Sequence, residues 1–138
     1  MIDITEKDFS VDQIISRMKG PEVGALVIFL GIVRGLSQGE KIKEMTVEAY
    51  EEMARKKMTE LEKIAIGRFG VTDISIIHRK GRLNPSENIV LVAASATHRR
   101  QAFEACSWLI DELKKTVPFW KKEYTSLGSR WVEDEGGE

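Results

Sequence analysis

The sequence predicts a single α+β domain. Segments with helical and with strand periodicity follow one another without the strict strand–helix–strand alternation of a doubly wound parallel sheet, and no internal repeat is present. The glycine-rich fingerprints of dinucleotide-binding and phosphate-binding loops are also missing from the sequence. In a chain of 138 residues, two separate cores would each be close to the lower size limit for autonomous folding. We therefore expect one domain over residues 1–132 and a frayed acidic tail over residues 133–138.

The first expected elements are a short helix and an apolar strand. Ser10 and Gln13 have the spacing of a capping box, and apolar residues then recur at helical spacing as far as Met18. Gly20-Pro21 ends this helix, because proline cannot continue it. Residues 25–33 are apolar at both odd and even positions, which predicts a strand that is buried on both faces.

A polar loop over residues 34–43 separates this strand from a second strand and a long helix. Residues 45–50 alternate enough to predict a strand with one solvated face. Residues 51–69 have the pattern of a helix that ends at Gly70. The residues expected on its inward face are Met53, Lys57 (through its aliphatic stem), Leu61, Ile64 and Ala65.

The second half of the chain predicts further strands and one more long helix. Their order is a strand over residues 73–80, a turn-rich connection over 81–86, a strand over 88–96, a helix over 97–117, and short strands over 119–124 and 129–132. Pro118 ends the helix. The residues expected on its buried face are Ala102, Phe103, Cys106, Leu109, Ile110, Leu113 and Val117.

Composition argues against several classes of function. The formal net charge is −1, from 21 basic and 22 acidic residues, so no overall positive field attracts nucleic acid or an anionic membrane. The single cysteine, Cys106, permits neither an intramolecular disulfide nor a zinc site built from cysteines. The first residues lack the basic flank and apolar run of a signal peptide, and no apolar run is long enough to span a bilayer. We therefore expect a cytoplasmic protein.

Basic residues stand at the start of the last long helix. His98, Arg99 and Arg100 lie where the helix dipole is positive and where acidic residues would be more stabilising. Free backbone N–H groups together with basic side chains predict an anion-binding site. The alternative is a solvated basic turn.

A second group of basic residues follows the end of that helix. Lysines at a helix C-terminus are usually structural, but Lys114 falls at the edge of the apolar face. Partial desolvation there lowers the pKa of a lysine and can make it a nucleophile or a base. Lys121 follows two aromatic residues on an expected strand, where it shares a face with Glu123.

Among the remaining candidates, Arg34 directly follows the apolar strand, in a position suited either to ligand binding or to an ordinary surface arginine. Cys106 lies within an apolar helix face, where a thiol has a raised pKa and is inert. His78 is interpreted as a structural, hydrogen-bonded residue. Two histidines without ligand spacing give little support for a metal site.

Taken together, the motifs resemble the large, catalytic subunit of the molybdopterin synthase family. The resemblance runs in order from about residue 3 to Val132. It is carried by Gly31-Ile32-Val33-Arg34-Gly35, Glu48-Ala49-Tyr50, Ile77 to Leu83, Thr97 to Ala105, Asp111 to Lys114, and Val117-Pro118-Phe119-Trp120-Lys121-Lys122-Glu123. The chain differs from the family in having Gly35 and Leu36 where an asparagine often follows the arginine.

The resemblance implies an α+β fold of the α/β-hammerhead type with a small additional antiparallel β element. It also implies a homodimer flanked by two copies of a ubiquitin-like small subunit, forming a heterotetramer. The small subunit carries a thiocarboxylate on its C-terminal glycine and supplies the sulfur. The implied reaction puts two sulfurs onto cyclic pyranopterin monophosphate to form the dithiolene of molybdopterin. The pterin is the substrate, so no metal and no cofactor are expected.

The resemblance also implies roles for individual residues. Lys114 and Lys121 match the catalytic lysines of the family, and both also match its substrate-binding positions. The other residues that match the substrate pocket are Ile32, Val33, Arg34, His98, Arg99, Lys122 and Glu123.

One geometric consequence follows from the helix. Arg99 and Lys114 are fifteen residues apart, or about 22 Å along one axis, so they cannot both hold one small pterin from a single chain. We therefore expect a pocket shared across the dimer, with His98 and Arg99 of one chain facing Arg34, Lys114 and Lys121 of the other. The alternative function is a non-enzymatic dimeric module that binds an anion or a partner's tail; nucleic-acid binding is disfavoured by the charge balance.

Overall fold

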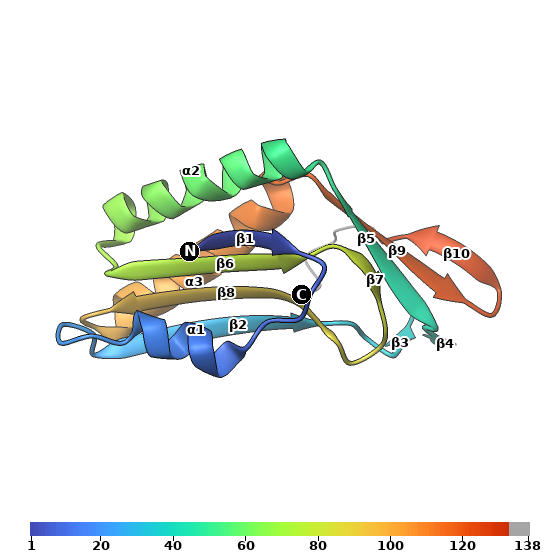
Figure 1. The fold of residues 1–138 in the computed structure, drawn as a ribbon, viewed down its shortest axis with the longest axis horizontal. Helices are drawn as coiled ribbons and strands as arrows, with labels where there is room; N and C mark the ends of the chain where they lie inside the picture. The colour runs from blue at the N-terminus through green and yellow to red at the C-terminus, as the bar shows by residue number, and fades with distance from the viewer. Residues whose placement is uncertain (133–138) are drawn as a thin grey trace.

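The structure is a computed structural model that describes residues 1–132. It contains two four-stranded sheets, a small two-stranded hairpin and three helices (Figure 1). The expected acidic tail, residues 133–138, lies outside the described residues. Helices and strands are mixed, and both sheets contain antiparallel pairs, so the predicted α+β class is confirmed.

The first sheet has the order β1-β6-β8-β2. Its strands are β1 (Ile2–Thr5), β6 (Asp73–Arg79), β8 (Asn88–Ala96) and β2 (Ala25–Ile32). β1 pairs with β6 in parallel, whereas β6–β8 and β8–β2 are antiparallel. β8 is a central strand rich in valine and alanine, and its last eight residues are buried. This is the pattern that near-continuous apolar sequence predicts for a strand covered on both faces.

Helices cover both faces of this sheet. α1 (Val11–Met18) packs Ile14 and Met18 against one face, where they meet Ile77 and Leu91. α2 (Glu51–Phe69) and α3 (Arg99–Thr116) cover the opposite face and share the main core with β6 and β8. The N-cap half of the capping box predicted for α1 is confirmed, because the Ser10 side chain accepts a hydrogen bond from the Gln13 backbone N–H at 3.3 Å. Such a cap stabilises a helix by about 1 kcal/mol.

The second sheet extends from one end of the first (Figure 1). Its order is β10-β9-β5-β7, with β10 (Gly128–Trp131), β9 (Phe119–Thr125), β5 (Glu44–Ala49) and β7 (Gly81–Leu83). All of its pairs are antiparallel. The hairpin of β3 (Leu36–Ser37) and β4 (Glu40–Lys41) lies beside this sheet. The extension of the second sheet creates a junction at which β2, the hairpin, β9 and β10 meet.

The prediction that residues 25–33 form a strand buried on both faces is partly wrong. The strand exists, but β2 is an edge strand of the first sheet and pairs only with β8 in the part of the chain that the structure describes. Seven of its eight residues are therefore only partly buried or exposed. Apolar residues at both odd and even positions of a strand indicate burial, but they do not distinguish a central strand from an edge strand.

The expected helix faces also need correction. In α2 the buried residues are Ala54, Met58, Leu61 and Ala65, while Met53 is 41% and Ile64 is 49% exposed. In α3, Phe103 is 61% exposed, whereas Ala102 and Cys106 are buried as predicted and Ala105, which was not predicted, is buried as well. Both helices carry apolar residues on more than one face, and small alanines let them approach the sheet and each other closely. Side-chain size at the contact, rather than hydropathy alone, selects the buried face.

Four short strands were not expected. β1 lies in a segment for which the sequence predicts no element, the β3–β4 hairpin lies in the predicted loop 34–43, and β7 lies in the predicted connection 81–86. Each is two to four residues long and owes its pairing to a neighbour that is distant in sequence or to a tight turn. Among residues 1–132, no helix combines the length and the apolar character needed to cross a bilayer.

Candidate functional site

A pocket of about 420 Å³ opens at the junction between the two sheets. The pocket is lined by the segment that follows β2, by the β3–β4 hairpin and by the end of the chain around β9 and β10. The lining residues are Arg34, Ser37, Gln38, Glu123, Arg130, Trp131 and Val132. Two guanidinium groups and one carboxylate therefore surround a space large enough for a small organic ligand.

Arg34 is held at the rim of this pocket by the backbone that precedes it. The register of β2 against β8 shifts between Gly31 and Ile32, so the chain leaves the sheet at an irregularity. Val33 is 2% exposed; its N–H donates to the Glu87 carbonyl and its carbonyl accepts from the Ser86 N–H, each at 2.9 Å. Ile32, by contrast, is 47% exposed. Burial and these two hydrogen bonds therefore hold the backbone of Val33 in place, and Arg34 directly follows it.

The strand β9 divides the motif Lys121-Lys122-Glu123 between its two faces. Lys121 and Glu123 stand opposite Val47 and Met45 of β5, both of which are buried. Lys122 points to the other face, where its Nζ lies 5.2 Å from the Trp131 ring centroid and 5.8 Å from that of Tyr124. The prediction that Lys121 and Glu123 share a face is confirmed, whereas Lys122 contacts aromatic rings on the opposite face.

Glu123 is the most buried charged residue of the site, at 2% exposure. Its Oε1 lies 3.4 Å from Nε of Arg130. Its Oε2 has no hydrogen-bond partner within residues 1–132. A buried carboxylate oxygen without a partner is costly, and in the wall of a pocket it is suited to accept a hydrogen bond from a ligand.

Lys121 lies beside a buried histidine. His78 is 3% exposed, its Nδ1 lies 2.8 Å from the Arg79 carbonyl oxygen, and its ring stacks on Phe119 with 3.7 Å between centroids. Burial lowers the pKa of His78 to about 3, and the positive charge of Lys121 acts in the same direction. His78 is therefore neutral and structural, as the sequence predicts.

Lys114 lies in the last turn of α3, between the buried residues Leu113 and Val117, and is itself half-buried. Because β9 begins directly after this helix end, the chain carries Lys114 and Lys121 on consecutive elements. Lys121 is half-buried as well. The prediction that Lys114 stands at the edge of the apolar face is confirmed.

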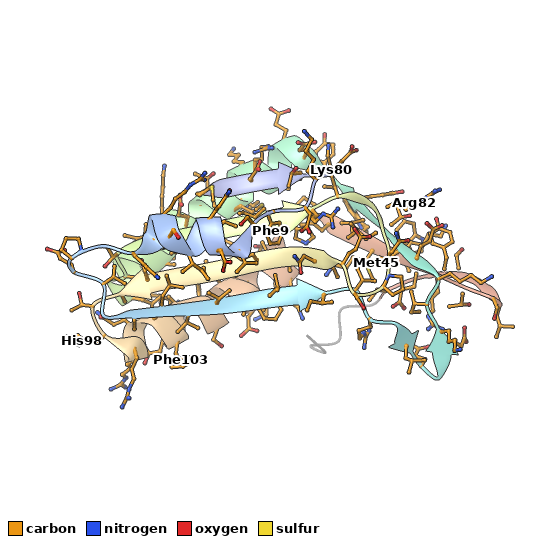
Figure 2. All side chains as sticks on the ribbon, turned by 60° about the horizontal axis from the view of Figure 1, so that its bottom comes forward. Phe9, Met45, Lys80, Arg82, His98 and Phe103 are labelled. Carbon is orange, nitrogen blue, oxygen red and sulfur yellow. The ribbon has the colours of Figure 1, made fainter. Side chains whose placement is uncertain are left out.

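His98 and Arg99 lie at the other end of α3. Both are exposed, and His98 occupies the N-cap position without a side-chain capping bond among the described residues. Figure 2 shows His98 and Phe103 at the end of the molecule opposite Met45 and Arg82 of the second sheet. A single chain therefore does not bring His98 and Arg99 together with Arg34, Lys121 and Glu123, as the distance along the helix predicts.

The remaining candidates do not form a reactive centre. Cys106 is 2% exposed, its Sγ lies 3.5 Å from the Val92 carbonyl oxygen, and burial raises the pKa of its thiol to about 11. This confirms the expectation of an inert thiol. Among the described residues, no three side chains of histidine, cysteine, aspartate or glutamate gather in a way that could hold a metal ion.

Arg130, Ser37 and Gln38 line the pocket but were missed by the sequence analysis. A signal for Arg130 was available, because the turn at residues 126–127 places it directly opposite Glu123 on the paired strand. Opposite charges at facing positions of an antiparallel pair are a recognisable pattern. Ser37 and Gln38 gave no such signal, because their hairpin is fixed by tertiary contacts.

Comparison with known proteins places the chain in a family. The family model described as MoaE protein matches residues 4–116. The molybdopterin synthase catalytic subunit of Pyrococcus abyssi is 46% identical over 127 residues, covering 92% of this chain and 86% of the relative. The corresponding subunit of Ralstonia nicotianae is 40% identical, covering 96% of this chain and 76% of the relative.

Solved structures agree with this placement. The crystal structure of molybdopterin synthase from Staphylococcus aureus superposes with a TM-score of 0.89 at 35% identity, covering 94% of this chain and 95% of that one. A complex of subunits 1 and 2 of molybdopterin-converting factor from Helicobacter pylori superposes with a TM-score of 0.79, covering 97% of this chain and 91% of that one. Because its sequence identity is only 18%, this similarity shows the fold alone. The family indicated by the sequence motifs is thus confirmed: the chain belongs to the MoaE protein family, whose relatives matched here are molybdopterin synthase catalytic subunits.

Proposed function

We propose that this chain is the sulfurtransferase subunit of a molybdopterin synthase. It takes sulfur from the thiocarboxylated C-terminal glycine of a ubiquitin-like small subunit and places it on cyclic pyranopterin monophosphate, forming the dithiolene of molybdopterin. The observation that carries this proposal is the pocket at the sheet junction, where Arg34 and the buried carboxylate of Glu123 line one space. The cytoplasm is the expected location for this reaction.

The substrate's chemistry matches the charges of the site. A phosphate group suits guanidinium side chains, which bind it through paired hydrogen bonds. Amino and ring N–H groups of the pterin suit an acceptor such as Glu123, whose Oε2 has no hydrogen-bond partner within residues 1–132. Lys114 and Lys121 are placed on the two elements that lead into this region.

The pocket is proposed to be completed by a second copy of the chain. His98 and Arg99 are exposed basic residues at the start of α3, about 22 Å along the helix from Lys114. In a homodimer they would supply the phosphate contacts for the pocket of the other protomer. A mixture of Lys114→Ala and Arg99→Ala chains tests this, because their heterodimer contains one intact pocket. Activity of the mixture no higher than that of either parent would contradict a shared site.

The sulfur is proposed to come from the partner because this chain has no suitable thiol. Its single cysteine, Cys106, is buried, and its pKa is raised to about 11. We propose that Lys114 activates or transiently holds the incoming acyl group and that Lys121 steers charge and protons at the pterin carbon. Both roles require a neutral amine during part of the cycle.

The direct test is incubation of the purified protein with thiocarboxylated small subunit and cyclic pyranopterin monophosphate. Mass spectrometry should detect the dithiolene product, and the small subunit should return to its carboxylate form. A small subunit that was never thiocarboxylated is the matched control and should give no product. Binding of the pterin without any turnover would refute the proposal and favour a non-enzymatic binding module.

A further inference from the structure

We propose that Arg130 is a positioning residue for substrate binding: it holds the Glu123 carboxylate and the β3–β4 hairpin in place as two walls of the pocket. This inference rests on the proposed function, because the ligand of the pocket is taken to be the pyranopterin. It concerns a residue that lies outside all the sequence motifs of the site.

The contacts of Arg130 connect three elements. Its Nε lies 3.4 Å from Oε1 of Glu123 on β9, and its Nη1 lies 3.4 Å from Oε1 of Glu40 on β4. Its Nη2 donates to the Ser37 carbonyl on β3 at 2.8 Å. Each of the three guanidinium nitrogens thus has a protein acceptor. Arginine is the side chain suited to such a junction, because its donors are held in a rigid planar fork.

The first consequence concerns the orientation of Glu123. With Oε1 directed to Arg130, the other oxygen, Oε2, is left without a hydrogen-bond partner in the described part of the chain. Glu123 is buried and lines the pocket, so water screens this arrangement poorly. Arg130 therefore compensates the charge of the carboxylate and keeps one acceptor available for the N–H groups of a pterin.

The second consequence concerns the hairpin. Each of its strands has only two residues, and its turn places Gln38 and Gly39 at φ values of 51° and 79°. A hairpin of this size is not stable by itself in water. Its tether to Arg130 fixes Ser37 and Gln38 in the pocket wall, and it also fixes the segment that directly follows Arg34. Loss of Arg130 should therefore loosen two walls at once.

These contacts predict an effect on substrate binding rather than on the chemical step. Arg130 acts through Glu123 and the hairpin, and its donors are directed to protein acceptors. Removing it should raise KM for the pyranopterin while leaving kcat nearly unchanged, because Lys114 and Lys121 are not its partners in any of these three contacts.

The experiment compares four variants in the complete complex with thiocarboxylated small subunit. Arg130→Ala should raise KM about tenfold or more, with kcat within about threefold of wild type. Arg130→Lys should be intermediate, because an ammonium group cannot span three fixed acceptors. Glu40→Gln weakens only the tether to the hairpin and should raise KM by about two- to threefold.

Arg82→Ala is the matched control. Arg82 lies on β7 of the same sheet, is 77% exposed in its side chain and pairs with Glu44 at 3.0 Å, away from the pocket lining. This variant should keep the wild-type KM. Thermal unfolding of every variant separates a local effect from a general loss of fold.

A wild-type KM in Arg130→Ala, or a fall in kcat at unchanged KM, would overturn the inference. If Arg130→Ala does not fold, Arg130→Lys and Glu40→Gln decide, and a wild-type KM in both overturns it. If the wild-type complex forms no dithiolene, the proposed function fails on its own. In that case, calorimetry measures the affinity of the wild type and the same variants for cyclic pyranopterin monophosphate. Equal affinities of Arg130→Ala and the wild type, or no binding to the wild type, would refute the positioning role of Arg130.

Discussion

Mild acid should destabilise the folded chain through His78, and this loss should begin above the pH range in which carboxyl groups titrate. The ring is 3% exposed, and burial together with the charge of Lys121 lowers its pKa from 6.5 to about 3. In the unfolded chain the same imidazole takes up a proton near its ordinary pKa. Between these two values the unfolded state therefore binds one more proton than the folded state, so the free energy of unfolding falls as the pH falls.

The size of the effect follows from the same linkage. One extra proton in the unfolded state corresponds to about 1.4 kcal/mol per pH unit. Between pH 6 and 4.5 the free energy of unfolding should therefore decrease by about 2 kcal/mol because of His78. The pKa of Glu51 is lowered by its hydrogen bond to Lys80, so the stability from that pair is present above the ordinary carboxyl pKa and is lost as the pH falls from there through the lowered pKa.

The assay is urea unfolding at pH 6.5, 5.5 and 4.5, at one fixed protein concentration, because assembly would make stability depend on concentration. His78→Gln should be less stable than wild type at pH 6.5, but its free energy of unfolding should vary less with pH. His98→Gln removes the chain's other histidine, which is exposed, and should keep the wild-type slope. Equal slopes for wild type and His78→Gln would refute the reasoning.

Three further predictions concern Lys114, the Cys106 thiol and the Ser10 cap of α1. Lys114→Arg keeps the positive charge but removes an accessible neutral amine, so turnover should fall about 100-fold or more; near-normal turnover would exclude a nucleophile or base role. Cys106→Ala should retain sulfur transfer and lose about 1 kcal/mol of stability in urea unfolding, and a folded variant that makes no product would contradict the proposed sulfur source. Ser10→Ala should lower the free energy of unfolding by about 1 kcal/mol without changing kcat, and an unchanged stability would show that the cap contributes nothing.

The secondary structure was predictable where the signal is local. The bounds of α2 and β8 coincide with the predicted ranges 51–69 and 88–96, and α3 differs from its prediction by two residues at the start and one at the end. Gly70, which ends α2, adopts a left-handed conformation with φ of 66°, as a glycine at a helix C-terminus does. Periodicity and stop signals lie within these segments, so no tertiary information was needed.

The buried faces were less predictable, since they depend on what packs against each element. Met53 and Ile64 are as apolar as Met58, yet they lie on the exposed side of α2. β2 has the composition of a central strand but is at the edge of its sheet. The order of strands and the distance between layers decide these points, and neither is encoded in any single segment.

The sequence by itself determined the α+β class, most of the elements, the inert character of Cys106 and the family to which the chain belongs. It also showed that Arg99 and Lys114 are too far apart on one helix to hold one small ligand. Only the tertiary structure assembled the pocket of Arg34, Glu123 and Arg130, because the segment that follows β2 meets the paired strands β9 and β10 at the junction of the two sheets. Local patterns set where strands and helices form, whereas the burial of Glu123 and its placement beside Arg34 depend on distant segments packing together.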